Sequence, residues 1–154
     1  MDEKTINVLY IDDEVNNITS FKAAFRRLFN IFTAESAEEG RKIVEEEDIH
    51  VILSDQRMPK TTGIEFFQSI LEIYPDPIRV LITGYTDINA VIDAINLGQV
   101  YKYLTKPWNE DEVKNAINVS YEVYDLRKKN KELTQKLIEM NEKLEFLARQ
   151  NLLS

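Results

Sequence analysis

The chain carries two adjacent acids directly after an apolar run. In the stretch VLYIDDEVNN, residues 8–17, Asp12, Asp13 and Glu14 follow the apolar residues with no basic residue between them. Two carboxylates about 4 Å apart repel by roughly 4 kcal/mol at an effective dielectric of 20. The pair therefore raises the question of which cation relieves the repulsion.

Other polar residues occur at the ends of later apolar runs. Asp55 follows a third run, Thr83 ends a fourth and Lys106 follows a fifth. If these runs are strands of one parallel sheet, their carboxyl ends meet at one rim, where sites form in such sheets. Oxygen ligands without His or Cys suit Mg²⁺ better than zinc. The pattern predicts a site for a divalent metal ion at that rim.

The elements that must position these residues alternate along the chain. The apolar runs rich in β-formers are Asn7–Ile11, Ile31–Ala34, Val51–Ser54, Val80–Thr83 and Tyr101–Leu104. Between them, apolar residues recur at helical spacing. Strands that alternate with helices predict a parallel sheet with helices on both faces, a doubly wound α/β fold. From Glu110 onward no strand pattern appears and no Gly or Pro follows Pro107, so we expect one long helix.

Composition excludes several classes of protein. No apolar run approaches the 18 or so residues of a membrane span. The first four residues carry acids where a signal peptide would carry basic residues, so export is not expected. The absence of cysteine excludes disulfides and thiolate metal sites and fits a cytoplasmic protein. The net charge of −8 argues against direct binding to nucleic acid.

The charge is unevenly distributed. Residues 1–120 hold 12 basic and 21 acidic side chains, whereas residues 121–154 hold 7 and 6. We therefore expect a domain over residues 1–120 and a different kind of segment over residues 121–154.

Four motifs carry a family resemblance. YIDDE, SDQRMP, LITG and YLTKPW stand in the order and spacing of the bacterial response-regulator receiver domain, and the chain resembles that chemotaxis-regulator-like family over roughly residues 5–120. The resemblance implies a flavodoxin-like, five-stranded sheet of order 2-1-3-4-5. It also implies phosphorylation by a sensor histidine kinase or a small phosphodonor, with enzymatic activity limited to phosphoryl transfer and hydrolysis on the protein itself.

The resemblance assigns roles to the acids. Asp55 matches the phosphate-accepting aspartate, and Asp12 and Asp13 match the acidic pair that holds Mg²⁺ together with it. The main-chain carbonyl of Arg57 would add a metal ligand.

It also assigns the residues that respond to phosphorylation. Thr83 and Lys106 would bond the new phosphate, and Tyr103 matches the aromatic switch residue. The bond between Lys106 and Pro107 is expected to be cis, which X-Pro bonds tolerate. The small Gly84 would leave access for the phosphate.

Two bulky residues lie near the expected phosphate. Arg57 and Tyr85 stand two positions beyond Asp55 and Thr83, where this family tunes hydrolysis of the aspartyl phosphate. We hypothesise that Arg57 and Tyr85 shield the phosphate from water and lengthen its life.

Each residue alone has a simpler interpretation. Asp12 or Asp13 could cap a helix, Asp55 could begin a turn, and Thr83, Tyr103 and Lys106 could be ordinary strand or surface residues. His50 is expected to be solvated or capping, and Trp108 to pack near the start of the last helix.

The last helix carries a narrow apolar stripe. Its seam positions, separated by alternating threes and fours, are Leu126, Asn130, Leu133, Leu137, Met140, Leu144, Leu147 and Asn151. A seam of two residues in seven predicts a coiled coil, and Asn at a positions favours a parallel pair. We therefore expect a parallel homodimer; the alternative is a helix folded back on its own domain.

The favoured function is a phosphorylation-controlled dimer that relays a signal to an output domain. The chain stops in mid-pattern, so it is expected to be either a fragment that lacks its output domain or a dimeric connector. One alternative is a receiver-like dimerisation scaffold that is never phosphorylated. Another is an aspartyl-phosphate phosphatase, which needs a second acid two residues after the nucleophile; Arg57 occupies that position.

Overall fold

The computed structural model describes residues 5–84, 86 and 88–153. They form one five-stranded parallel sheet of order β2-β1-β3-β4-β5, which confirms the predicted fold and strand order. The elements are β1 (Asn7–Ile11), α1 (Val15–Phe25), β2 (Asn30–Ala34), α2 (Ala37–Glu46), β3 (Val51–Asp55), α3 (Gly63–Ile70), β4 (Ile78–Thr83), α4 (Ile88–Asn96), β5 (Lys102–Thr105) and α5 (Glu110–Leu153).

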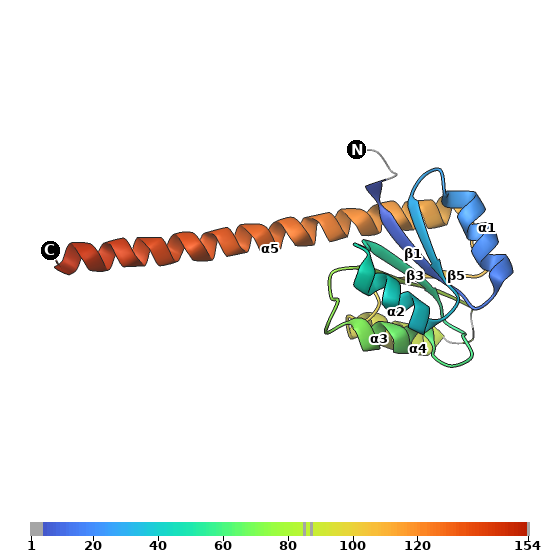
Figure 1. The fold of residues 1–154 in the computed structure, drawn as a ribbon. Helices are drawn as coiled ribbons and strands as arrows, with labels where there is room; N and C mark the ends of the chain where they lie inside the picture. Colours follow the sequence, from blue (N-terminus) through green and yellow to red (C-terminus); the bar gives the residue numbers. More distant parts are fainter. Residues whose placement is uncertain (1–4, 85, 87, 154) are drawn as a thin grey trace. The chain divides into compact units, whose positions relative to one another are not determined.

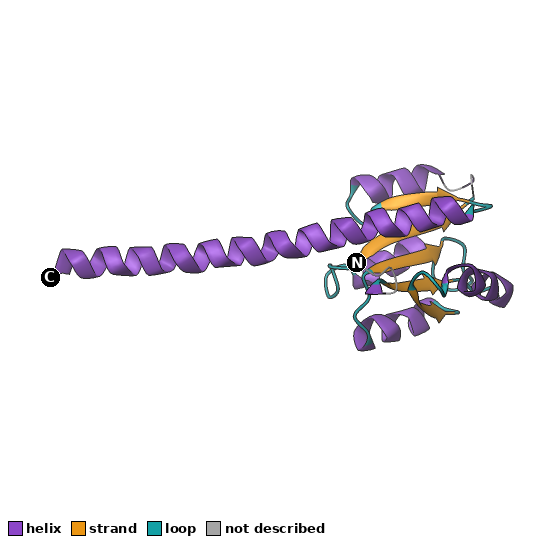
Figure 2. Cartoon of the chain, turned by 90° about the horizontal axis from the view of Figure 1, so that it is seen from above, coloured by secondary structure: helices purple, strands orange, loops and turns teal. Residues whose placement is uncertain are grey.

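Helices cover both faces of the sheet (Figure 1). Strand residues alternate between the faces, so β1 sends Val8 and Tyr10 to one core and Leu9 and Ile11 to the other. The first core also takes apolar residues of α1 and the beginning of α5, and the second takes those of α2, α3 and α4. Figure 2 shows the strands enclosed between the two layers of helices. Every residue of β3 and β4 is buried, which explains why both strands are almost continuously apolar.

The register brings the carboxyl ends of the central strands to one level. Ile11 pairs with Ser54 across β1 and β3, and Asp55 pairs with Ile82 across β3 and β4. Thr83 pairs with Thr105 across β4 and β5. The residues that end these strands or follow them therefore share the rim that the sequence predicted.

The structure divides into two compact units, one extending to Tyr124 and the other from Asp125 to the end of the chain. The long helix α5 runs through both. In the first unit it buries Val113, Ala116 and Ile117 against the sheet.

The part of α5 in the second unit has no buried residue among those described. Its seam residues Leu126, Leu133, Leu137, Met140, Leu144 and Leu147 are between 56% and 65% exposed. Asn130 and Asn151 are exposed as well. None of the described helices offers an apolar stretch long enough to cross a membrane.

Candidate functional site

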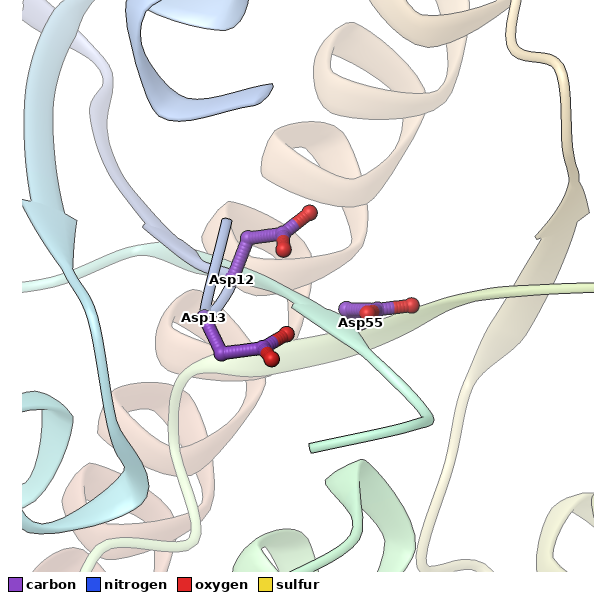
Figure 3. A group of neighbouring side chains, drawn as sticks. All are labelled: Asp12, Asp13 and Asp55. Carbon is purple, nitrogen blue, oxygen red and sulfur yellow. The ribbon is translucent and has the colours of Figure 1, made fainter. Parts of the chain in front are cut away.

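Three carboxylates gather at the ends of β1 and β3. Asp12 and Asp13 directly follow β1, and Asp55 is the last residue of β3. One ligand oxygen of each lies within 4.8 Å of those of the other two. Figure 3 shows the three side chains lying side by side at these strand ends. Asp12 and Asp55 are buried, and Asp13 is the most exposed of the three.

The Asp55 carboxylate lies in an unfavourable environment for its charge. Only 4% of the residue is exposed, and this burial raises the pKa of its carboxyl. The hydrogen bond and positive charge of Lys106 lower the pKa, whereas the negative charges of Asp12 and Asp13 raise it further. The net shift is upward, so a cation at this site would relieve a real electrostatic cost.

Lys106 supplies one positive charge. Its Nζ lies 2.6 Å from Oδ1 of Asp55, and its backbone N–H donates to the carbonyl of Thr83 at 2.9 Å. The bond between Lys106 and Pro107 is cis. The side chain is 38% exposed, so the ammonium group borders both the carboxylates and solvent.

Thr83 and Tyr103 lie on neighbouring strands. Thr83 is the buried last residue of β4, one position beyond the residue that pairs with Asp55, and its hydroxyl donates to the carbonyl of Gly84 at 3.2 Å. Tyr103 is half-buried on β5 against the second core. A methyl group at Gly84 would meet nothing within 4 Å, so packing does not demand glycine there.

Arg57 joins two of the loops at this rim. It is exposed, and its Nη2 donates to Oγ1 of Thr86 at 2.8 Å, which links the segment after β3 to the segment after β4. Tyr85, the other bulky residue of the sequence-based hypothesis, lies outside the described residues.

The three acids fit Mg²⁺. Their ligand oxygens lie within 4.8 Å of one another, and oxygens bound at about 2.1 Å to one octahedral ion lie about 3 to 4 Å apart, so the side chains would close slightly around the ion. The donor set contains oxygen alone, and Mg²⁺ binds few carboxylates and keeps waters in its remaining positions. Three carboxylates and one lysine leave a net negative charge that a divalent cation offsets.

Several residues that complete the site were not singled out from the sequence. The Tyr10 hydroxyl and the Asn17 amide both donate to Oδ2 of Asp12, at 2.7 and 3.0 Å. Alternation along a strand places Tyr10 on the same side of the sheet as the residue two positions later, and this signal was available. At the other end of the loop after β3, Thr62 and Glu65 form a capping box that starts α3.

Two expectations about aromatic residues have different outcomes. Trp108 is half-buried against Phe21 and Phe25, as expected, in the segment just before α5. His50 was expected to be solvated or capping, but its side chain is only 12% exposed. Its Nδ1 accepts the backbone N–H of Asn7 at 2.9 Å, because the loop before β3 lies beside the start of β1.

Comparison with known proteins agrees with this geometry. Residues 8–118 match the family model described as response regulator receiver domain. The hydrogenase transcriptional regulatory protein HoxA of Bradyrhizobium diazoefficiens is 34% identical over 121 residues, which cover 79% of this chain and 25% of that protein. GlrR of Escherichia coli, a transcriptional regulatory protein, is 29% identical over 126 residues, covering 79% and 28%. The chain thus spans about a quarter of the length of these relatives.

Solved structures show the same fold. A response regulator receiver domain protein from Clostridium thermocellum superposes with a TM-score of 0.74 at 30% identity, covering 79% of this chain and 98% of that one. A structure described as adenylate cyclase from Rhodopirellula baltica superposes with a TM-score of 0.83 at 31% identity, covering 88% and 99%. The family match and these structures cover the unit that holds the three acids.

Proposed function

The chain belongs to the response regulator receiver domain family, and from that premise we propose that Asp55 accepts a phosphoryl group from a sensor histidine kinase or a small phosphodonor. The observation that carries the proposal is the buried Asp55 carboxylate 2.6 Å from the Lys106 ammonium and flanked by Asp12 and Asp13. A carboxylate so placed is a nucleophile with a cation beside it and an acidic pair that can hold a metal ion.

The transfer forms one bond and breaks one. An Asp55 oxygen attacks phosphorus while the bond from phosphorus to the donor atom breaks, and the electron pair of that bond leaves with the donor. Lys106 stays beside the carboxylate and offsets charge on the transferring group. Mg²⁺ held by Asp12, Asp13, Asp55 and the carbonyl of Arg57 would neutralise further charge on the phosphoryl oxygens.

The neighbouring strands supply the response. In the structure Thr83 donates to the carbonyl of Gly84, and the same hydroxyl can instead donate to a phosphoryl oxygen on Asp55. Gly84 leaves space for that group. Tyr103, half-buried on the adjacent strand, then turns inward and carries the change to the surface.

The second unit transmits the signal. Its exposed seam pairs two copies as a parallel coiled coil, and phosphorylation of the receiver unit alters that dimer. HoxA and GlrR are named as transcriptional regulatory proteins, and one similar solved structure is described as an adenylate cyclase. Receivers of this kind therefore serve different outputs. We propose a cytoplasmic connector that relays to an output domain, without direct contact with nucleic acid or membrane by residues 1–154.

Intact mass spectrometry tests phosphorylation. The chain is incubated with Mg²⁺ and acetyl phosphate, as wild type, Asp55→Asn and the control Asp93→Asn, whose side chain is exposed on α4. We expect one labile phosphoryl group on the wild type and on the control, and none on Asp55→Asn. Turnover of many donor molecules would instead indicate the phosphatase alternative. A wild-type protein that shows no phosphoryl label and no turnover would support the scaffold alternative.

A further inference from the structure

Tyr10 is held rigidly beneath the acidic site. It lies on β1 with 1% of its surface exposed, and its ring stacks on Phe21 of α1 with centroids 4.1 Å apart and planes 1° from parallel. Phe21 in turn packs edge-on against Trp108, two residues after Lys106. The phenol therefore has a fixed ring and one polar atom that points at the rim of the sheet.

The polar atom is bonded to a proposed metal ligand. The Tyr10 hydroxyl donates to Oδ2 of Asp12 at 2.7 Å, and Nδ2 of Asn17 donates to the same oxygen at 3.0 Å. The backbone N–H of Glu14 donates to Oδ1 at 3.0 Å. A carboxylate offers about four lone-pair positions, so these three donors leave about one, on Oδ1.

We infer that Tyr10 is a positioning residue for the metal site: its hydroxyl fixes the Asp12 carboxylate so that Oδ1 faces the ion. The inference rests on the proposed function, because it assigns Asp12 to Mg²⁺. Donors behind a ligating carboxylate hold its orientation, and their loss typically weakens metal binding 10- to 100-fold. Asn17 acts on the same oxygen from α1 and assists Tyr10.

Burial explains why a tyrosine suits this task. Asp12 is itself fully buried, so water is not at hand to replace a lost donor. The ring of Tyr10 packs in the first core while its hydroxyl reaches the rim, which an aliphatic residue of the same strand could not do.

Metal binding by the folded protein provides the test. Tyr10→Phe keeps the ring on Phe21 and removes only the hydroxyl. The matched control is Tyr74→Phe, because Tyr74 is half-buried against the other core. Mn²⁺ is titrated into each protein, and the free ion is followed by electron paramagnetic resonance. We expect the Kd for Mn²⁺ to rise roughly 10-fold or more for Tyr10→Phe and to stay unchanged for Tyr74→Phe.

A second readout separates positioning from a purely structural role. Phosphorylation by acetyl phosphate should need roughly 10-fold more Mg²⁺ in Tyr10→Phe and reach the wild-type rate at saturating Mg²⁺. A residue that only stabilises the core would lower the urea midpoint without metal and leave the Kd unchanged, which would overturn the inference.

Two further outcomes are distinguishable. If Tyr10→Phe does not fold, Asn17→Ala decides, since Asn17 lies outside both cores and donates to the same oxygen. An unchanged Kd for Asn17→Ala would then overturn the inference. If the wild type binds no Mn²⁺, the metal role in the proposed function fails, whereas binding that is equal in wild type and Tyr10→Phe overturns the inference alone.

Discussion

The two units of the chain treat apolar side chains in opposite ways. The first unit buries most of its large apolar residues in two cores, one on each face of the sheet. The second unit is a single helix whose six apolar seam residues are all more than half exposed. Most helices in proteins are stabilised by packing of their apolar face. The contrast teaches that the receiver unit contains the packing partners of its own apolar residues, whereas the exposed seam of the second unit has a partner only in the dimer that we propose.

The units also differ in how they use charge. In the first, Asp12, Asp13 and Asp55 lie close together in a group that could hold a metal ion. In the second, charged residues form exposed pairs one helical turn apart, such as Glu145 with Arg149 at 3.6 Å. Such pairs contribute little to stability. Charge substitutions should therefore alter chemistry in the first unit and have small effects on the outer face of the second.

The largest expected effect is loss of association in Leu133→Asp. The substitution places a carboxylate at the seam of each of two helices. In the proposed dimer each Leu133 would be buried between the helices. Loss of one buried leucine costs at least about 2 kcal/mol, so the dimer would lose at least about 4 kcal/mol, or about 10³-fold in its Kd. Sedimentation velocity over a range of concentrations should show a dimeric wild type and a monomeric variant.

The control for that measurement is Ile138→Asp. Ile138 is similarly exposed, at 47%, but stands outside the seam, so this variant should remain dimeric. Both variants should still be phosphorylated, because the acids lie in the other unit. A monomeric wild type would contradict the proposed homodimer, and the apolar stripe would then have to bind a partner other than a second copy.

The next effect concerns Lys106→Met. Removing a positioned cation from a phosphoryl-transfer site should slow phosphorylation by acetyl phosphate about 100-fold, similar to the loss of one transition-state donor in other enzymes. The rate is followed by intact mass under saturating Mg²⁺. Lys102→Met, on the strand β5 that ends one residue before Lys106 and also partly buried, should react at the wild-type rate. Equal rates for all three proteins would mean that Lys106 holds Asp55 without assisting transfer.

Sequence alone predicted the strand ends well, for a physical reason. Parallel strands must all point their carboxyl ends to one rim, so Asp12, Asp55, Thr83 and Lys106 could be placed near one another once the strands were recognised. The central strands β1, β3 and β4 were recognisable because burial on both faces leaves almost continuous apolar runs. Their ends differ from the prediction by up to two residues: β4 begins earlier, at Ile78.

Contacts between distant segments could not be predicted from the sequence. His50 gives no local sign that its Nδ1 accepts the backbone N–H of Asn7, 43 residues away. Its ring also contacts Tyr121 and Tyr124 of α5, with centroids 5.2 and 4.8 Å away. Periodicity shows which face of a segment is buried, but the partner atoms follow only from the register of the whole sheet. The pairing of two helices through the seam likewise stays a prediction.

A smaller effect is expected from Arg57→Ala. If Arg57 shields the phosphate through its bond to Thr86, its removal should shorten the life of the aspartyl phosphate. A net loss of about 1 kcal/mol, typical of one hydrogen bond, corresponds to about fivefold. Decay of the labelled protein is followed by intact mass. Thr86→Val removes only the acceptor and should have part of the effect; an unchanged decay rate in Arg57→Ala would refute shielding.

The smallest effect is a change in stability from Asp55→Asn, measured in urea with a chelator. Because the folded state raises the pKa of Asp55, it binds the proton more tightly than the unfolded state does. The stability of the wild type therefore falls as the pH rises from the pKa of Asp55 in the unfolded chain through its raised pKa in the folded protein, and it stays lower at neutral pH.

Asp55→Asn should be the more stable protein at pH 7, by on the order of 1 kcal/mol, because the partly exposed Lys106 is solvated when it loses its partner. The difference should shrink as the pH is lowered and Asp55 of the wild type becomes protonated. Asp93→Asn, exposed on α4, should follow the wild type at every pH. A less stable Asp55→Asn at pH 7 would mean that the ion pair with Lys106 outweighs burial, and that the acids of the first unit, like those of the second, are already balanced without a metal ion.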